Sequence, residues 1–235
     1  MQLLTIRVTM MATVLAFDVY GTLIDTHGVV IKLQEFVGGK AEGFSRVWRE
    51  KQLEYSFRRG LMRSYETFGV CTSQALDYTC TYLDVELSTD QKAALMAEYR
   101  GLPAFDDVKE SLERLKADGH SLYAFSNGTA DTVEELLAAA GILDLFGGVV
   151  SADDRQTFKP NPDVYEHLLN TTAASADDTW LISCNPFDVI GAVSYGLSSA
   201  WVRRSNKLIF DPWGIDPTLT ITGLRELGRL LSTPD

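Results

Sequence analysis

The feature that most constrains the fold of this chain is a short apolar segment, residues 13–17, that ends at a carboxylate. The segment reads Thr-Val-Leu-Ala-Phe, a composition typical of a strand buried on both faces of a parallel sheet. Asp18 follows directly, and Gly21 supplies a residue suited to a tight turn. A polar residue just past a central strand lies where open α/β sheets bind ligands. Asp18 is therefore a nucleophile, a metal ligand or the cap of the next helix.

Beyond this strand the chain alternates predicted strands and helices, except in one long helical stretch. Further strands are predicted at residues 121–125, 148–151, 179–183 and 198–202. Helices are predicted at residues 106–118, 129–140, 163–170, 188–195 and 222–231. This alternation predicts an α/β fold, a right-handed, doubly wound parallel sheet of Rossmann-like type.

The helical stretch spans residues 25–100. Apolar residues recur at three- and four-residue steps over residues 42–68, which predicts one amphipathic helix with a break near Gly60. Two more helices are predicted at residues 73–83 and 88–100, and Ser88 with Gln91 forms a capping-box pattern. Residues 25–39 are expected to be a connection with some helical content.

We expect two domains. Residues 25–100 form a helical cap inserted after the first strand, and residues 1–24 with 101–235 form the α/β core. The leader, residues 1–13, lacks an extended apolar segment followed by a cleavage site, so we interpret it as an alternative start rather than a signal peptide.

Charge and composition exclude several classes of function. The formal net charge of -11 and the pI of about 4.7 argue against binding to nucleic acid or to anionic membranes. No run of about 18 apolar residues predicts a membrane span. The three cysteines form no CxxC pair, which indicates reduced thiols in a cytoplasmic protein. The negative charge also repels an anionic substrate, so any anion site needs local positive groups.

Polar side chains follow four of the predicted strands. Parallel strands present their carboxyl ends at one edge of the sheet, so these groups are expected to converge. They are Asp18, the Ser126-Asn127-Gly128 turn, Lys159, and the Ser183-Cys184-Asn185 segment with Asp188. Each alone is readily explained as a turn, a helix cap or a solvated lysine. Together, at four successive strand ends, they indicate a functional site.

The segment from Asp18 to Leu23 resembles the first motif of the haloacid dehalogenase superfamily, whose members use the leading Asp as a covalent nucleophile. Most members are magnesium-dependent phosphatases with a second Asp two residues later, where this chain has Tyr20. A tyrosine does not hold a hard cation as a carboxylate does. Cys184 and Asn185 also stand where the phosphatases carry an acid in the fourth motif. The resemblance thus implies the branch that works without metal or other cofactor.

A narrower resemblance is carried by residues 48–55, Trp-Arg-Glu-Lys-Gln-Leu-Glu-Tyr. This run is similar to the arginine-bearing segment of L-2-haloacid dehalogenases, and residues 125–128, 158–166 and 183–188 resemble the same enzymes. The similarity extends over residues 16–202. It implies hydrolysis of short L-2-halo acids to D-2-hydroxy acids through an aspartyl ester, with inversion at C2. We also expect the enzyme to be a homodimer in the cytoplasm.

The resemblance implies a role for each matching residue. The catalytic residues would be Asp18, Thr22, Arg49, Ser126, Lys159, Tyr165, Ser183, Asn185 and Asp188. Asp18 would attack C2, Lys159 would keep it ionised, and Asp188 would act as the base for ester hydrolysis. Ser183 and Asn185 would orient the base or the water, and Thr22 and Tyr165 would supply supporting hydrogen bonds.

The same resemblance implies a substrate-binding set. Arg49, Asn127 and Phe187 would surround the departing halide. Ser126 and the backbone N–H groups of Val19 and Tyr20 would hold the substrate carboxylate. Phe187 stands where the well-known dehalogenases carry Trp, which leaves the halide preference open.

Two alternative functions stay open from the sequence, and so does the role of one apolar stripe. A phosphatase of the same superfamily would depend on magnesium, and a catalytically silent binding protein would keep its role after substitution of Asp18. The apolar stripe that includes Trp48, Leu53, Tyr55 and Phe57 is either a homodimer contact or a core-facing surface.

Overall fold

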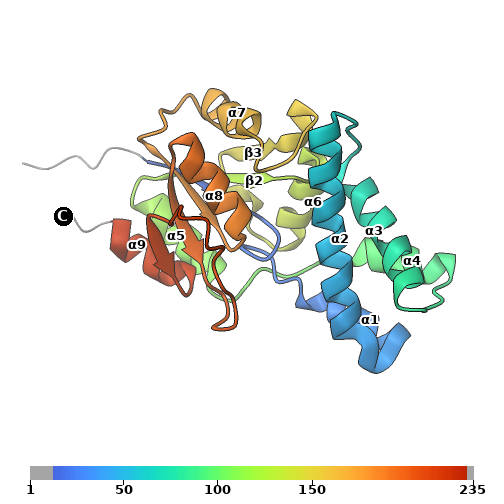
Figure 1. Cartoon of the computed structure of the whole chain (residues 1–235). Helices are drawn as coiled ribbons and strands as arrows, with labels where there is room; N and C mark the ends of the chain where they lie inside the picture. Colours follow the sequence, from blue (N-terminus) through green and yellow to red (C-terminus); the bar gives the residue numbers. More distant parts are fainter. Residues whose placement is uncertain (1–12, 232–235) are drawn as a thin grey trace, which may run out of the picture.

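A computed structural model of the protein describes residues 13–231 (Figure 1). Its centre is a six-stranded sheet in the order β3-β2-β1-β4-β5-β6, in which every neighbouring pair is parallel. The strands are β1 (Val14–Phe17), β2 (Ser121–Ser126), β3 (Gly148–Ser151), β4 (Thr179–Ser183), β5 (Ser198–Val202) and β6 (Leu219–Ile221). The predicted α/β fold is confirmed, with β1 and β4 at its centre.

Helices cover both faces of the sheet. They are α5 (Val108–Ala117), α6 (Ala130–Ala139), α7 (Pro162–Thr172), α8 (Pro186–Tyr195) and α9 (Leu224–Leu231). Leu15 and Phe17 of β1 belong to an apolar cluster with residues of α5, α6 and α9, whereas Ala16 belongs to a second cluster with residues of α7 and α8. Strand side chains alternate between faces, so β1 is buried on both sides, as its sequence predicted.

The remaining helices lie together on the side of the molecule to the right in Figure 1. They are α1 (His27–Val37), α2 (Ala41–Met62), α3 (Phe68–Tyr82) and α4 (Thr89–Glu98). Helix α2 packs against both α1 and α3, and α1 also contacts α4. We refer to residues 27–98 as the helical segment. Among helices of residues 13–231, none has the length and apolar character needed to cross a membrane.

The helical segment differs from the prediction at the end of its second helix. Helix α2 runs through Gly60 without a break and ends at Met62 rather than continuing to residue 68. Arg63 has a left-handed backbone (φ 53°), which turns the chain out of the helix. Helix α3 then begins at Phe68, earlier than predicted, because the Thr67 hydroxyl accepts a hydrogen bond from the Val70 N–H and caps it.

Other elements were predicted with mixed success. The capping box of Ser88 and Gln91 is present at the start of α4. The connection predicted at residues 25–39 contains the full helix α1, and the short edge strand β6 was not predicted. The interpretation of residues 1–13 as an alternative start falls on residues that, apart from Thr13, lie outside the described part of the chain.

The apolar stripe of α2 faces the interior at Trp48. This side chain is buried, donates its Nε1–H to the Thr72 carbonyl at 2.8 Å, and meets the rings of Phe44 and Tyr99 edge to face. Phe57 contacts Phe187 at the start of α8, with ring centroids 5.2 Å apart. The core-facing interpretation is therefore confirmed for Trp48, which is too deeply buried for a dimer contact. Leu53, Tyr55 and Phe57 are half-buried.

Candidate active site

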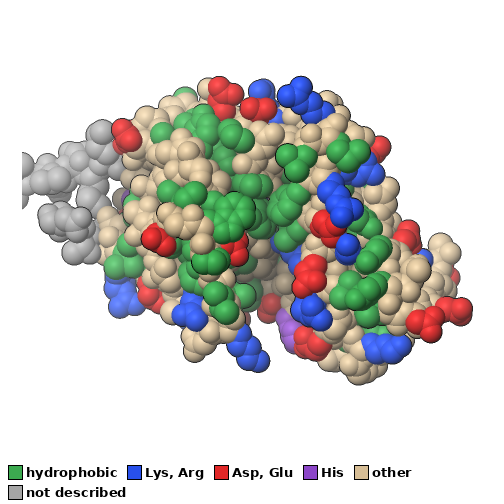
Figure 2. All heavy atoms as spheres, in the orientation of Figure 1, with side chains coloured by type: hydrophobic (Ala, Val, Ile, Leu, Met, Phe, Trp, Pro, Cys, Tyr) green, Lys and Arg blue, Asp and Glu red, His purple; other side chains and the backbone are tan. Residues whose placement is uncertain are grey.

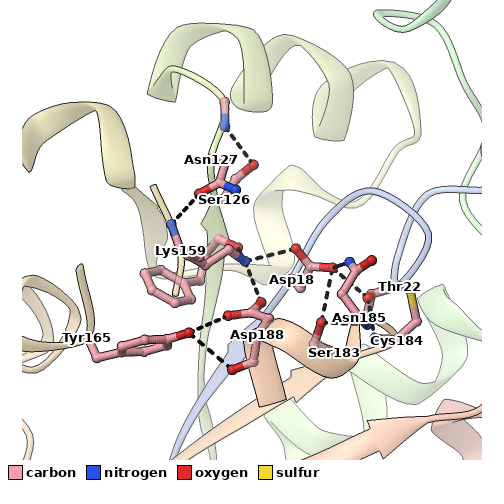
Figure 3. Close-up of polar contacts among 12 residues, drawn as sticks. Asp18, Thr22, Ser126, Asn127, Lys159, Tyr165, Ser183, Cys184, Asn185 and Asp188 are labelled. Carbon is pink, nitrogen blue, oxygen red and sulfur yellow. Dashed lines mark hydrogen bonds and ion pairs between the residues drawn. The ribbon is translucent and has the colours of Figure 1, made fainter. Parts of the chain in front are cut away.

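The carboxyl ends of β1, β2 and β4 lie at one edge of the sheet. Phe17, the last residue of β1, is aligned with Ala124 of β2 and with Ile182 of β4. The residues that follow therefore reach a common point. The Asp18 side chain lies in a hydrogen-bonded network with residues from three segments of the chain, namely Thr22, Lys159 and residues 183–185 (Figure 3). The convergence predicted from the strand ends is present.

Lys159 occupies the centre of this network. Its Nζ donates hydrogen bonds to Asp18 Oδ1 (2.9 Å), Asp188 Oδ2 (2.6 Å) and the Phe125 carbonyl (3.0 Å). An ammonium group has three protons, so all three are used. The side chain is 1% exposed, and a buried ammonium requires this degree of pairing to remain charged. Lys159 thus holds the two carboxylates on either side of one fixed positive charge.

The second oxygen of Asp18 is more heavily bonded than the first. Asp18 Oδ2 accepts from Thr22 Oγ1 (2.8 Å), Asn185 Nδ2 (2.8 Å) and Ser183 Oγ (3.2 Å), as Figure 3 shows. Among residues 13–231, Oδ1 accepts only from Lys159. The carboxylate is therefore fixed in one orientation. Oδ1 accepts fewer hydrogen bonds than Oδ2, so more of its lone-pair density is free.

Asp188 lies behind Lys159 and is fully buried. Its Oδ2 accepts from Lys159, and its Oδ1 accepts from the hydroxyl of Tyr165 at 3.0 Å. The Tyr165 hydroxyl can reach this far because α8 has Gly191 at the contact, where a Cβ would stand 2.3 Å from the hydroxyl oxygen. Tyr165 thus orients Asp188 across the α7–α8 packing.

The two carboxylates differ in their acidity. Burial raises the pKa of Asp18, but the charge and hydrogen bond of Lys159 outweigh it, and the pKa lies below its ordinary value. Burial raises the pKa of Asp188 to about 6, a rise that Lys159 opposes and the charge of Asp18 increases. Asp18 is therefore the permanently ionised member of the pair, and Asp188 is the one able to exchange a proton near neutral pH.

Ser126 and Asn127 lie at the end of β2 beside the network. Asn127 Oδ1 accepts from the backbone N–H of Lys159 at 2.8 Å, and Ser126 Oγ accepts from the Gly128 N–H at 3.1 Å. Ser151, at the end of β3, donates to the Gly128 carbonyl at 2.6 Å. Asn127 therefore also fixes the loop that carries Lys159, a role beyond the halide contact predicted for it.

A cleft of about 970 Å³ opens between the helical segment and the sheet edge. Its walls include Arg49 of the helical segment, Tyr99 just after that segment, and Tyr20, Gly128 and Asn185 from loops at the sheet edge. Figure 2 shows the hollow between α2 and the side of the molecule that carries the sheet. The cleft reaches the residues that surround Asp18 and is large enough for a small organic acid.

Arg46 and Arg49 of α2 both line the cleft, and Arg49 is the one whose charge acts on Asp18. The Arg49 Nη1 donates to Gln52 Oε1 at 2.6 Å, and Gln52 Nε2 donates to Thr72 Oγ1 at 2.6 Å, so α3 fixes the position of the guanidinium through Gln52. Burial is the main cause that raises the pKa of Cys184 to about 11, while the charge of Arg49 acts to lower it. The charge of Arg49 also acts to lower the pKa of Asp18. Arg49 thus brings positive charge toward the nucleophile from across the cleft.

The remaining predicted binding residues, Val19, Tyr20 and Phe187, differ in how they relate to the cleft. The backbone N–H groups of Val19 and Tyr20 donate to no other residue in the described part of the chain, which leaves both donors available. Burial raises the pKa of Tyr20 to about 12, so its hydroxyl stays protonated. Phe187 packs on Phe57 and is not among the residues that line the cleft, so the position predicted to contact halide lies at the cleft's margin.

The donor set does not fit a magnesium ion. Residues 13–231 contain no group of three or more His, Cys, Asp or Glu side chains placed to hold a metal. Between the two carboxylates of the network lies the ammonium of Lys159, and the amide of Asn185 donates to Asp18 rather than offering it an oxygen. Hard cations take carboxylate, carbonyl and water oxygens, so no step is assigned to a metal.

Sequence reasoning missed two residues near the network. Trp201 Nε1 donates to the Cys184 carbonyl at 3.1 Å, and Arg204 Nη2 donates to the Thr22 carbonyl at 2.6 Å. Both lie at or just past the carboxyl end of β5, the edge at which the other site residues were found. The same positional rule, applied to the fifth strand, identifies them.

This doubly wound parallel sheet, with a buried aspartate at the end of β1 paired to a buried lysine, has the layout of an α/β enzyme with a charged site at the sheet edge. The sequence model of haloacid dehalogenase-like hydrolases matches residues 12–196. The chain belongs to this family.

Relatives within the family are similar over almost the whole chain. A protein of Pseudomonas sp. (strain YL) named (S)-2-haloacid dehalogenase is 34% identical over 219 residues, which cover 93% of this chain and 94% of that protein. Haloacetate dehalogenase H-2 of Moraxella sp. (strain B) is 33% identical over 218 residues, with 93% and 97% covered. The solved structure of L-2-haloacid dehalogenase from Xanthobacter autotrophicus superposes with a TM-score of 0.90 at 30% identity, covering 96% of this chain and 100% of that one.

Proposed function

We propose that this protein hydrolyses short L-2-halo acids to D-2-hydroxy acids through an ester on Asp18, with inversion at C2 and without a metal. The observation that carries the proposal is the state of Asp18. It is ionised and buried, and three donors hold Oδ2 while Oδ1 keeps a single partner. The names of the relatives supply the substrate class.

In the first step Asp18 Oδ1 attacks C2 of the substrate and the carbon–halogen bond breaks. The halide leaves on the opposite face, which inverts the configuration at C2. Arg49 is the positive group that faces the nucleophile across the cleft, and we assign it to the developing halide charge. Asn127 and Phe187 remain proposed neighbours of the halide.

The substrate carboxylate needs donors of its own, because the net charge of -11 opposes an anion. The backbone N–H groups of Val19 and Tyr20 are unused within the described residues. Successive N–H groups at the end of a strand form a favourable anion site. We assign the carboxylate to them and to the hydroxyl of Ser126.

In the second step a water molecule attacks Cγ of the esterified Asp18. Asp188 accepts the proton of this water, and its elevated pKa suits a general base. Oδ2 becomes the oxyanion of the tetrahedral intermediate, and its three donors Thr22, Ser183 and Asn185 are already in place. Collapse of the intermediate breaks the Cγ–Oδ1 bond, and the departing alkoxide takes the proton from Asp188 and leaves as the hydroxy acid. The carboxyl group left on Asp18 loses its proton to solvent, which restores the carboxylate.

The first test is halide release from the two enantiomers of 2-chloropropionate, with and without excess chelator. The proposal predicts chloride from the L form alone, equal rates with chelator, and D-lactate as product. Chloride release that stops with chelator, or phosphate release from phosphate esters that requires magnesium, would favour the phosphatase alternative. Retention of a binding role after Asp18→Asn, with no turnover in the parent chain, would favour the silent binding protein.

We also propose that residues 25–100 act as a cap domain on a core of residues 1–24 and 101–235. The cleft supports this division, because Arg49 comes from the helical segment and Asn185 from the sheet edge. Substrate access would then depend on the distance between the two parts.

We further propose that the protein is a homodimer in the cytoplasm. Met62 and Tyr82 are exposed on α2 and α3, and the ring of Tyr82 stacks on Tyr78, which lines a surface groove together with Met62. Exposed apolar groups gathered in this way mark interaction surfaces. The free thiols of Cys71, Cys80 and Cys184 suit a reducing compartment. Light scattering should give twice the chain mass for the parent and the single mass for Met62→Glu, and a monomeric parent would refute the dimer.

A further inference from the structure

We propose that Arg204 is a positioning residue for the nucleophile and acts through Thr22. This inference rests on the proposed function, because it concerns the same aspartate. Arg204 lies two residues past the end of β5, and its side chain is 14% exposed. It makes no contact with Asp18, so any effect on the reaction must pass through a neighbour.

The guanidinium of Arg204 joins a buried carboxylate to the loop after β1. Its Nη1 is 2.6 Å from Asp107 Oδ1, and its Nη2 donates to the Thr22 carbonyl at 2.6 Å. The face of the guanidinium lies over the ring of Phe105, with its Cζ 4.2 Å from the ring centroid. Two directed donors and a stacked face fix the group in a way that a lysine ammonium does not reproduce.

Asp107 is itself anchored to the core. Its Oδ2 accepts the backbone N–H of Leu224, the first residue of α9, at 2.7 Å, and Gly223 allows the close approach because a Cβ there would stand 2.8 Å from Oδ2. Asp107 directly precedes α5. The pair of Asp107 and Arg204 thus connects two helices of one sheet face to the Thr22 carbonyl.

Thr22 connects the pair of Asp107 and Arg204 to Asp18. Its hydroxyl donates to Asp18 Oδ2 at 2.8 Å and accepts the backbone N–H of Cys184 at 2.8 Å. The one side chain therefore links the loop after β1 to the nucleophile and to the end of β4. If the Thr22 backbone shifts, the donor that holds Asp18 shifts with it. Small displacements of a nucleophile have large effects on rate, so Arg204 is expected to act on turnover rather than on substrate binding.

The test is Arg204→Lys, which keeps a positive charge beside Asp107 but loses the two-pronged geometry. We expect kcat for L-2-chloropropionate to fall about tenfold, the fold-change that loss of one charged hydrogen bond produces, with KM changed less than about twofold. Chloride release in the first turnover should slow by the same factor, because the attack by Asp18 is affected. Arg225→Lys is the matched control: Arg225 also joins a carboxylate, Glu110, to a backbone carbonyl, but at the exposed surface.

A double-mutant cycle separates positioning from general stability. In a Thr22→Ala background the hydroxyl that carries the effect is absent, so Arg204→Lys should change kcat less than about twofold. An equal loss in both backgrounds, or an unchanged kcat in a folded Arg204→Lys protein, would overturn the proposal. If Arg204→Lys does not fold, Asp107→Asn frees the guanidinium while its amide oxygen still accepts the Leu224 N–H, and the same outcomes apply.

A readout independent of activity separates this proposal from the proposed function. Because the Cys184 N–H donates to the Thr22 hydroxyl, its hydrogen exchange reports on the position of Thr22. We expect exchange at Cys184 to be about tenfold faster in Arg204→Lys and unchanged in Arg225→Lys. Unchanged exchange in both would refute the link from Arg204 to Thr22, whether or not the parent chain releases halide.

Discussion

At the scale of single residues, one buried ammonium sets the chemistry of two carboxylates. Lys159 is within 2.9 Å of Asp18 and 2.6 Å of Asp188. Burial raises the pKa of both acids, but at Asp18 the charge and hydrogen bond of Lys159, with the Thr22 hydrogen bond and the Arg49 charge, outweigh it, whereas at Asp188 burial and the charge of Asp18 prevail. The difference separates a nucleophile that stays ionised from a base that can take up a proton. It also makes the pH dependence of the two chemical steps predictable.

Turnover should have an acidic limb that belongs to Asp188. The pKa of Asp188 is raised to about 6 while Asp18 is ionised, and the ester lacks the Asp18 charge that adds to this rise. Hydrolysis of the ester should therefore slow as Asp188 is protonated at a pH below about 6. The pKa of Asp18 is lowered, so the attack step should continue through the same range. Measured between pH 4.5 and pH 8, kcat should therefore fall on the acid side while the first-turnover release of halide changes little.

Asp188→Asn tests the same assignment. Loss of the base should lower kcat by about 100-fold or more, within the range for general-base catalysis, and mass spectrometry should find the ester accumulated on Asp18. Asp154→Asn, at an exposed position outside the network, is the control and should behave as the parent. Full activity of Asp188→Asn, or an acidic limb that it retains, would assign the base elsewhere.

At the scale of elements, the close packing of α8 against α7 depends on a glycine. A Cβ at Gly191 would stand 2.3 Å from the Tyr165 hydroxyl oxygen and 2.5 Å from Pro160 Cβ, distances that require one of the elements to move. Gly191→Ala should therefore lower the free energy of unfolding by about 1–3 kcal/mol and lower kcat, because Tyr165 loses its hold on Asp188.

Gly43→Ala is the matched control for this prediction. Gly43 also lies within a helix, α2, but a Cβ there would meet nothing within 4 Å. It should raise the free energy of unfolding by up to about 1 kcal/mol and leave kcat unchanged. Urea unfolding and halide release measure both quantities, and equal effects of the two substitutions would contradict the packing argument.

Much of the sheet and half of the site followed from local pattern. Strands β3, β4 and β5 have the bounds predicted from runs of apolar residues, and Asp18, Lys159 and Asp188 meet because parallel strands end at one edge. What pattern alone does not contain is contact between distant segments. The strand-end rule places Arg204 near this edge of the sheet, but it does not predict that the guanidinium bonds to Asp107 and to the Thr22 carbonyl.

The ends of elements were the least predictable part, for a physical reason. Helix α2 stops at Met62 because Arg63 adopts a left-handed backbone conformation. Arginine rarely adopts this conformation, so the sequence does not predict the end of the helix. Strand β6 has only three residues and depends on pairing with β5 rather than on its own pattern. Local propensity is weak wherever tertiary contacts decide the outcome.

At the scale of the whole molecule, the helical segment and the sheet edge are joined beside Lys159. Tyr65, in the α2–α3 connection, donates to Asp153, which follows β3, and its ring lies 5.2 Å from that of Phe158. Phe68 also contacts Phe158, which directly precedes Lys159. The contact that places the helical segment thus also supports the loop that carries the central lysine.

Tyr65→Phe should loosen this junction. It keeps the ring contact but removes the hydrogen bond to Asp153, so the free energy of unfolding should fall by about 1 kcal/mol and kcat/KM should fall several-fold as Arg49 loses its fixed distance from Asp18. Tyr82→Phe, at an exposed tyrosine, is the control. If stability and kcat/KM both match the parent, the hydrogen bond between Tyr65 and Asp153 does not fix the position of the helical segment relative to Asp18.

The central claim is that Asp18 is alkylated, and a single turnover in ¹⁸O-labelled water tests it most directly. With enzyme in excess over L-2-chloropropionate, the hydroxyl oxygen of the product comes from Asp18 if the ester forms, because water attacks Cγ and not C2. We expect unlabelled lactate in the first turnover and ¹⁸O in the carboxylate of Asp18. Lactate that carries ¹⁸O from the first turnover would show that water attacks C2 directly and would contradict the account.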